Sequence, residues 1–121
     1  MSGPVTIHVC VTCRAGPDGF ERPGAKFADA IDARLNGDGA IRLQRVECMQ
    51  VCKRPCTVAL SGAGKWTYVV ADVTQDANLE DVLAAARLYA ATPDGVMPWR
   101  ERPAPFRRNV VSRIPPLRID P

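Results

Sequence analysis

The sequence predicts a domain of the α/β (α+β) class, with helices packed on a mixed sheet in the order β-α-β-β-β-α and an extended tail at the end. Three observations predict this class. A helical apolar spacing lies between two stretches of alternating apolar residues, an aromatic and β-branched hairpin follows, and prolines crowd residues 93–121. The chain has 121 residues, of which 46% are hydrophobic and 24% charged, as expected for one globular domain.

The first half of the chain predicts a parallel pair of strands joined by a helix. Apolar and polar residues alternate over residues 5–9, a period of two that predicts a half-buried strand ending at Cys10. Residues 14–23 form a loop rich in Gly and Pro. Helical spacing over residues 24–35 predicts an amphipathic helix, and alternation at residues 41–43 predicts a second strand. Because a helix crosses between them, the two strands should pair in parallel.

The second half predicts an antiparallel hairpin and a last helix. A short strand at residues 57–60, a turn at residues 61–64 and an aromatic, β-branched strand at residues 66–73 make the hairpin. Asn78 is the expected cap of the last helix. The buried stripe of this helix should be Leu79, Val82, Leu83 and Ala86. This order is the layout of a thioredoxin-like domain, which we expect at residues 1–92.

The positive charge of the chain lies in its last part. The net charge is +3, but residues 1–92 carry ten basic and ten acidic side chains. Residues 93–121 carry six Arg against three acidic residues, together with seven of the eleven prolines. Proline blocks both helix and central strand, so an extended Pro/Arg-rich tail is expected over residues 93–121. This tail is a candidate docking arm for an acidic redox partner or a second subunit.

Several classes of protein are disfavoured by the sequence. No apolar run approaches the length of about 18 residues that spans a bilayer, and the N-terminus lacks a secretory signal, so a cytoplasmic protein without membrane contact is expected. The neutral body gives no reason to expect a nucleic-acid partner. Common nucleotide-binding and hydrolase motifs are absent and His8 is the single histidine, so we expect no enzymatic activity.

The cysteines carry the functional information. They form two groups, Cys10-x2-Cys13 and Cys48-x3-Cys52-x3-Cys56, and an odd number without a signal peptide argues against a disulfide framework. Cys10 and Cys48 each follow the carboxyl end of one of two parallel strands, so the two groups should meet at one edge of the sheet. A four-thiolate cage results, which iron-sulfur clusters and zinc both accept. A Rieske centre is excluded, because it needs two histidines.

These motifs resemble known families. Residues 46–52, followed by a proline and a strand, resemble the second cluster-binding segment of thioredoxin-like 2Fe-2S ferredoxins and of the small 2Fe-2S subunit of respiratory NADH dehydrogenase. Residues 9–14 together with residues 48–56 resemble the DUF1636 family of predicted metal-binding proteins. The resemblance implies a 2Fe-2S cluster held by the first two cysteines of each group, Cys10, Cys13, Cys48 and Cys52. Cys56 has no ferredoxin counterpart and is a reserve fourth ligand.

The resemblance also implies a role in electron transfer. A ferredoxin-like carrier needs donor and acceptor proteins, is commonly a homodimer, and in this family is often encoded near cobalamin-synthesis and metal-handling genes. Two alternatives remain open: a structural zinc-binding module, and a thioredoxin-like dithiol at Cys10 and Cys13. About ten loop residues separate Cys13 from the following helix, which disfavours the dithiol because a helix N-terminus should activate its nucleophile.

Overall fold

The computed structural model describes residues 5–11, 23–35, 40–47 and 56–116. Within these residues, five strands form one sheet in the order β2-β1-β3-β4-β5. The strands are β1 (Val5–Cys10), β2 (Ile41–Val46), β3 (Val58–Gly62), β4 (Thr67–Val70) and β5 (Val110–Ile114). The helices are α1 (Pro23–Leu35), α2 (Gln75–Ala91), the 3-10 turn η1 (Trp99–Glu101) and the short α3 (Pro105–Arg108).

The sheet is mixed, as predicted. β1 and β2 pair in parallel, with Val5 opposite Ile41 and Cys10 opposite Val46. The pairs β1–β3, β3–β4 and β4–β5 are antiparallel. The predicted β-α-β-β-β-α order is therefore confirmed through α2, and β1 lies between β2 and β3 near the centre of the sheet.

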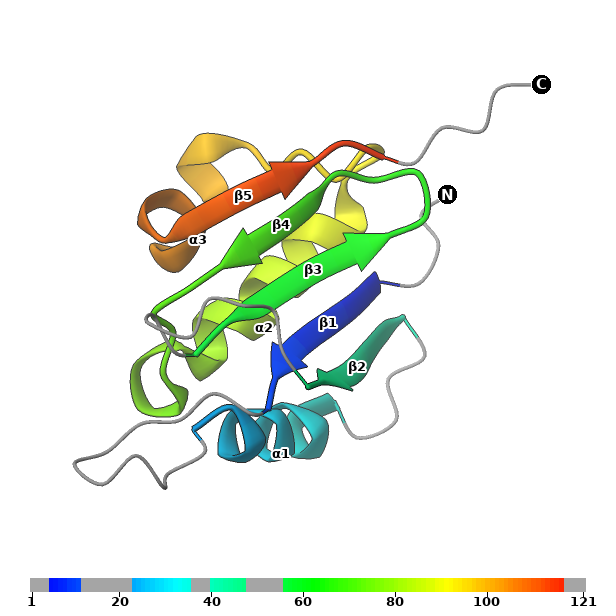
Figure 1. Ribbon diagram of the computed structural model, residues 1–121. Helices are drawn as coiled ribbons and strands as arrows, with labels where there is room; N and C mark the ends of the chain where they lie inside the picture. Colours follow the sequence, from blue (N-terminus) through cyan, green and yellow to red (C-terminus); the bar gives the residue numbers. More distant parts are fainter. Residues whose placement is uncertain (1–4, 12–22, 36–39, 48–55, 117–121) are drawn as a thin grey trace.

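Helices α1 and α2 cover one face of the sheet and pack against each other (Figure 1). Alternate residues of β1 point into this layer, because Val5, Ile7 and Val9 are fully buried while Thr6 and His8 are half-buried. The helices contribute the buried side chains Phe27, Ile31, Val82, Leu83 and Ala86. The strand and helix periods read from the sequence thus define the core.

Helix α2 begins earlier than predicted. The sequence placed its cap at Asn78, but the helix starts at Gln75. The Thr74 backbone N–H donates to Asn78 Oδ1 over 2.9 Å, and the Asn78 N–H donates to the Thr74 carbonyl over 2.8 Å. Asn78 therefore binds back to the helix start from within the first turn instead of occupying the cap position.

Strand β4 is shorter than predicted, ending at Val70 where the sequence suggested Val73. Asp72 has a φ of 56°, in the left-handed region, which a regular strand does not accommodate. The Ala71 N–H donates to the Asn109 carbonyl over 3.0 Å, outside the β3–β4 ladder. The turn at Asp72 directs the chain into α2.

The Pro/Arg-rich segment is more structured than an extended tail. In its described part, residues 93–116, Val110–Ile114 is an extended strand, but η1 and α3 are helical turns that the sequence did not predict. Pro105 occupies the first turn of α3, where its missing N–H is harmless. Met97 and Phe106 are fully buried in the same core as the sheet. The segment from residue 93 thus packs on the body.

The carboxyl end of α2 is closed by a buried lysine. Lys65 is 3% exposed, and its Nζ donates to the carbonyls of Tyr89, Ala90 and Thr92 over 2.9, 3.1 and 2.7 Å. These carbonyls lie at the negative end of the helix, where a cation is favoured. Burial lowers the pKa of Lys65, and the charge of Asp94 opposes this shift.

None of the helices in the described ranges is long and apolar enough to cross a membrane.

Candidate metal centre

Cys10 lies where three strands meet. It is the last residue of β1 and is 1% exposed. Its N–H donates to the carbonyl of Thr57, the residue before β3, over 3.0 Å, and the next N–H, of Val11, donates to the Val46 carbonyl of β2 over 2.9 Å. Hydrogen bonds on both sides therefore fix the backbone of Cys10 at this edge of the sheet.

The end of β2 reaches the Cys10 side chain. The Cys10 Sγ lies 3.8 Å from the Glu47 carbonyl oxygen, with the thiol as donor. Glu47 directly precedes Cys48 in the sequence. The predicted meeting of the two strand ends is thus present up to the residue before Cys48. The predicted ligands Cys13, Cys48 and Cys52 themselves lie outside the described residues.

Cys56, the predicted reserve ligand, is part of the hydrophobic core. It is 1% exposed and exchanges two backbone hydrogen bonds with Val73, of 3.1 and 3.2 Å. Burial, and next the proximity of Cys10, raise the pKa of the Cys56 thiol to about 11. Without a bound metal, Cys56 is therefore a protonated, apolar side chain at neutral pH.

Both long helices begin at the cysteine edge. An added Cβ at Gly24, in the first turn of α1, would lie 1.8 Å from the Cys10 carbonyl oxygen, so only glycine permits this approach. Helix α2 begins two residues after Val73, which pairs with Cys56. Helix N-termini carry partial positive charge and favour an anionic group nearby. The first turn of α1 therefore lies against the Cys10 backbone.

A buried hydroxyl lies beside Cys10. Thr57 is fully buried, and within the described residues its Oγ1 has no hydrogen-bond partner. The antiparallel register that pairs Val9 with Val58 places Cys10 opposite Thr57, on the same face of the sheet. Thr57 and Gly24 belong to no sequence motif, so sequence reasoning missed both.

The His8 side chain is hydrogen-bonded within the protein, as expected for a structural histidine. Its Nε2 is hydrogen-bonded to Ser61 Oγ over 2.6 Å. Burial lowers the pKa of His8, and a hydrogen bond with Gln44 opposes this shift. This histidine is engaged on β3 and is not required as a ligand.

The residues at the cysteine edge suit a thiolate-bound, anionic metal group. Cys10 provides a soft sulfur ligand, two helix N-termini lie nearby, and the Thr57 hydroxyl, which has no partner in the described part of the chain, is a spare donor. Within the described ranges no three His, Cys, Asp or Glu side chains converge on a metal position. That result is expected, because three of the four predicted ligands lie outside these ranges.

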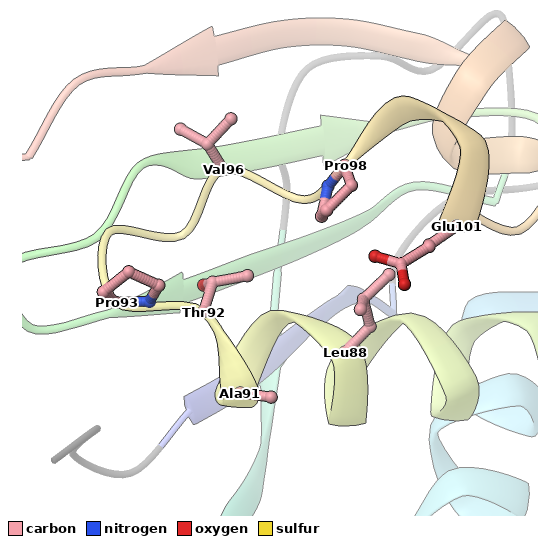
Figure 2. Close-up of a pocket in the computed structure, with 7 residues that line it drawn as sticks. All are labelled: Leu88, Ala91, Thr92, Pro93, Val96, Pro98 and Glu101. Carbon is pink, nitrogen blue, oxygen red and sulfur yellow. The ribbon is translucent and has the colours of Figure 1, made fainter.

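A separate cavity of about 310 Å³ lies at the other end of α2. Figure 2 shows it between the last turns of the helix and the segment that leads to η1. Its lining is Leu88, Ala91, Thr92, Pro93, Val96, Pro98 and Glu101. This mostly apolar lining offers one carboxylate, one hydroxyl and no thiolate, so the cavity is not the site of the predicted chemistry.

Comparison with known proteins identifies a family and confirms the fold. The model of a family described as "Protein of unknown function (DUF1636)" matches residues 7–116. We found no curated protein that matches the chain.

Two solved structures of thioredoxin-like [2Fe-2S] ferredoxins from Aquifex aeolicus are similar to this structure. One is 16% identical with a TM-score of 0.61, covering 93% of this chain and 94% of the other. The second, the wild-type protein at 1.5 Å resolution, is 17% identical with a TM-score of 0.58, covering 92% and 99%. At this identity the likeness shows the fold, and it confirms the predicted thioredoxin-like class.

Proposed function

Since this chain belongs to the DUF1636 family and has a thioredoxin-like fold, we propose that it is a one-electron carrier holding a 2Fe-2S cluster. The ligands are Cys10, Cys13, Cys48 and Cys52. The cluster supplies the electron chemistry when bound. The chain supplies the thiolates, excludes water from one side of the cluster and stabilises the negative charge of the cluster.

The proposal depends chiefly on one contact. The Cys10 Sγ lies 3.8 Å from the Glu47 carbonyl, although these residues are 37 positions apart in the sequence. Cys10 belongs to the first cysteine group and Glu47 directly precedes the second, so this contact supports the proposal that the two groups meet at this edge. Two sequence-distant cysteine pairs that meet at a sheet edge form the donor set expected of a four-thiolate centre.

The surroundings of Cys10 favour a group of negative charge. A 2Fe-2S core with four thiolates is an anion in both oxidation states, and its charge grows on reduction. The N-termini of α1 and α2 point their partial positive charges toward this edge. The core beneath it is apolar and includes the protonated Cys56, so the medium on that side has a low dielectric.

Metal analysis of cysteine variants tests this proposal. Wild-type chain purified without oxygen should contain iron and acid-labile sulfide in equal amounts. Cys48→Ser should lose both, whereas Cys56→Ala should retain both, because Cys56 belongs to the core and alanine leaves no hydroxyl there. Loss of iron in Cys56→Ala with its retention in Cys13→Ser would show that the fourth ligand is wrong. Zinc without iron in the wild type would establish the structural zinc module instead.

We further propose that an acidic redox partner docks at this same end of the sheet. Strands β3 and β5 both begin at this end, and α3 directly precedes β5 (Figure 1). Arg107 and Arg108 of α3 are exposed. In Arg107→Glu/Arg108→Glu, oxidation of the reduced protein by anionic ferricyanide should slow, and oxidation by a cationic cobalt complex should accelerate. Arg87→Glu/Arg100→Glu is the charge-matched control; equal effects in both variants would reject local docking.

A further inference from the structure

The Thr57 hydroxyl is an anomaly in this core. Thr57 is fully buried, and within the described residues its Oγ1 has no hydrogen-bond partner. Buried hydroxyls are nearly always hydrogen-bonded, because they lose their bonds to water on folding. Valine has almost the same shape and would fill this position without that loss. The threonine therefore calls for an acceptor.

The position of Thr57 indicates that acceptor. The Thr57 carbonyl accepts from the Cys10 N–H over 3.0 Å, so the two residues are direct cross-strand neighbours. Directly opposed residues of an antiparallel pair project to the same face, with Cβ atoms about 4.5–5.5 Å apart. A sulfur acceptor on Cys10 is thus within the reach of a threonine side chain.

Metal binding decides whether the Cys10 sulfur donates or accepts a hydrogen bond. Its thiol has a proton to donate and lies near the Glu47 carbonyl. A metal-bound Cys10 is a thiolate, which has no proton and only accepts hydrogen bonds. An adjacent O–H donor then becomes favourable.

We infer that the Thr57 hydroxyl donates a hydrogen bond to the Cys10 thiolate when the metal group is bound, and that it thereby sets the reduction potential. This inference rests on the proposed function. Hydrogen bonds to cluster sulfurs stabilise the reduced form, which carries more negative charge, and raise the potential. Thr57 is a positioning residue in this role: it acts through a ligand and is not itself one.

The test uses the full-length chain with its cluster assembled without oxygen. In Thr57→Val the equilibrium for reduction should fall about tenfold, which for one electron is a decrease of about 59 mV in the potential. Thr57→Ser restores the hydroxyl and should restore the wild-type potential. Thr6→Val is the matched control, because Thr6 lies on the same strand face as Cys10 but pairs with Ser61 at the far end of β1.

A second readout separates this role from a structural one. In the cluster-free chain, urea unfolding of Thr57→Val should show stability equal to or above that of the wild type, since the hydroxyl has no partner among the described residues. A clear loss of stability, with an unchanged potential in the loaded protein, would show a structural hydroxyl and overturn the inference. A wild-type chain that assembles no cluster overturns the proposed function and this inference together. A cluster whose potential does not respond to Thr57→Val overturns this inference alone.

Discussion

Phe106 provides a direct test of whether the Pro/Arg-rich segment belongs to the folded core. It lies in α3, within the segment from residue 93 onward, and is fully buried. Its ring packs edge-on against Tyr68 of β4, with centroids 6.5 Å apart and an interplanar angle of 63°. Replacing Phe106 by alanine would remove this contact and leave a cavity beneath the sheet.

The expected cost follows from burial. Fully buried Phe→Ala changes cost about 3–5 kcal/mol, of which the aromatic pair accounts for about 0.5–1.5 kcal/mol. The whole stability of a domain of this size is about 5–15 kcal/mol. At about 4 °C per kcal/mol, Phe106→Ala should lower the melting temperature by about 12–20 °C.

Urea unfolding followed by circular dichroism measures this loss in the metal-free chain. Val111→Ala in β5 is the control, because Val111 is 42% exposed and its truncation should change the free energy of unfolding by less than about 0.5 kcal/mol. A loss below about 1 kcal/mol for Phe106→Ala would refute the packing described for this segment. The same packing predicts that deletion of residues 93–121 unfolds the body, so point substitutions are the proper probes of docking.

Three further changes test other parts of the structure. Lys65→Met leaves three carbonyls at the end of α2 without their buried donor and should cost about 1–3 kcal/mol in the free energy of unfolding, measured by urea denaturation. Gly24→Ala forces a Cβ against the Cys10 carbonyl and should cost about 3 kcal/mol while reducing iron content. Burial raises the pKa of Tyr89 to about 12, above the ordinary value of 10.0, so the contribution of Tyr89 to the free energy of unfolding should be constant below about pH 10 and fall between about pH 10 and 12. A tyrosinate absorbance titration checks that pKa.

Each of these changes has a control and a contradicting outcome. Lys26→Met removes an exposed lysine of α1 and should be nearly neutral; equal losses in the two lysine variants would contradict the capping role of Lys65. Gly64 has a φ of 71° and no neighbour within 4 Å, so Gly64→Ala should cost only about 1–2 kcal/mol and retain iron. An unchanged iron content in Gly24→Ala would contradict the close approach of α1. Tyr89→Phe should remove the part of the alkaline loss that belongs to Tyr89 and leave the part that belongs to the buried Cys56 thiol, whose pKa is raised to about 11. An unchanged loss between about pH 10 and 12 would contradict the raised pKa of Tyr89.

The elements that depend on local periodicity were predictable from the sequence. Alternation over residues 5–9 and helical spacing over residues 24–35 correspond to β1 and α1, because burial on one face imposes these periods directly. The parallel pairing of β1 with β2 followed from the crossover helix between them. Chain connectivity thus gave the topology near the cysteines.

The features that the sequence did not predict depend on contacts between distant residues. Tyr68 holds Phe106 by ring packing and accepts a hydrogen bond from the Met97 N–H over 3.1 Å, so a segment that reads as an irregular tail folds onto the sheet. Asn78 has the side chain of a helix cap but binds back to Thr74 from inside the helix. Composition identifies neither arrangement, because each depends on which partner the side chain meets.

The candidate site also has features that the sequence predicts and features that only the fold shows. Cysteine spacing indicated a thiolate centre, since two groups of closely spaced cysteines have few other uses in a chain of this length. Gly24 and Thr57 carry no motif, and their importance follows only from their positions against the backbone of Cys10. Residues that support a ligand are recognised through the fold, whereas the ligands themselves are recognised through spacing.

The most direct test of the central claim is a reductive titration of the wild-type chain, purified without oxygen and followed by visible absorbance. A 2Fe-2S carrier should be red-brown, lose its visible absorbance on addition of dithionite, and take up one electron for each cluster. Recovery of the spectrum on reoxidation would show that the change is reversible. A colourless chain that binds zinc tightly and takes up no electron would contradict the claim.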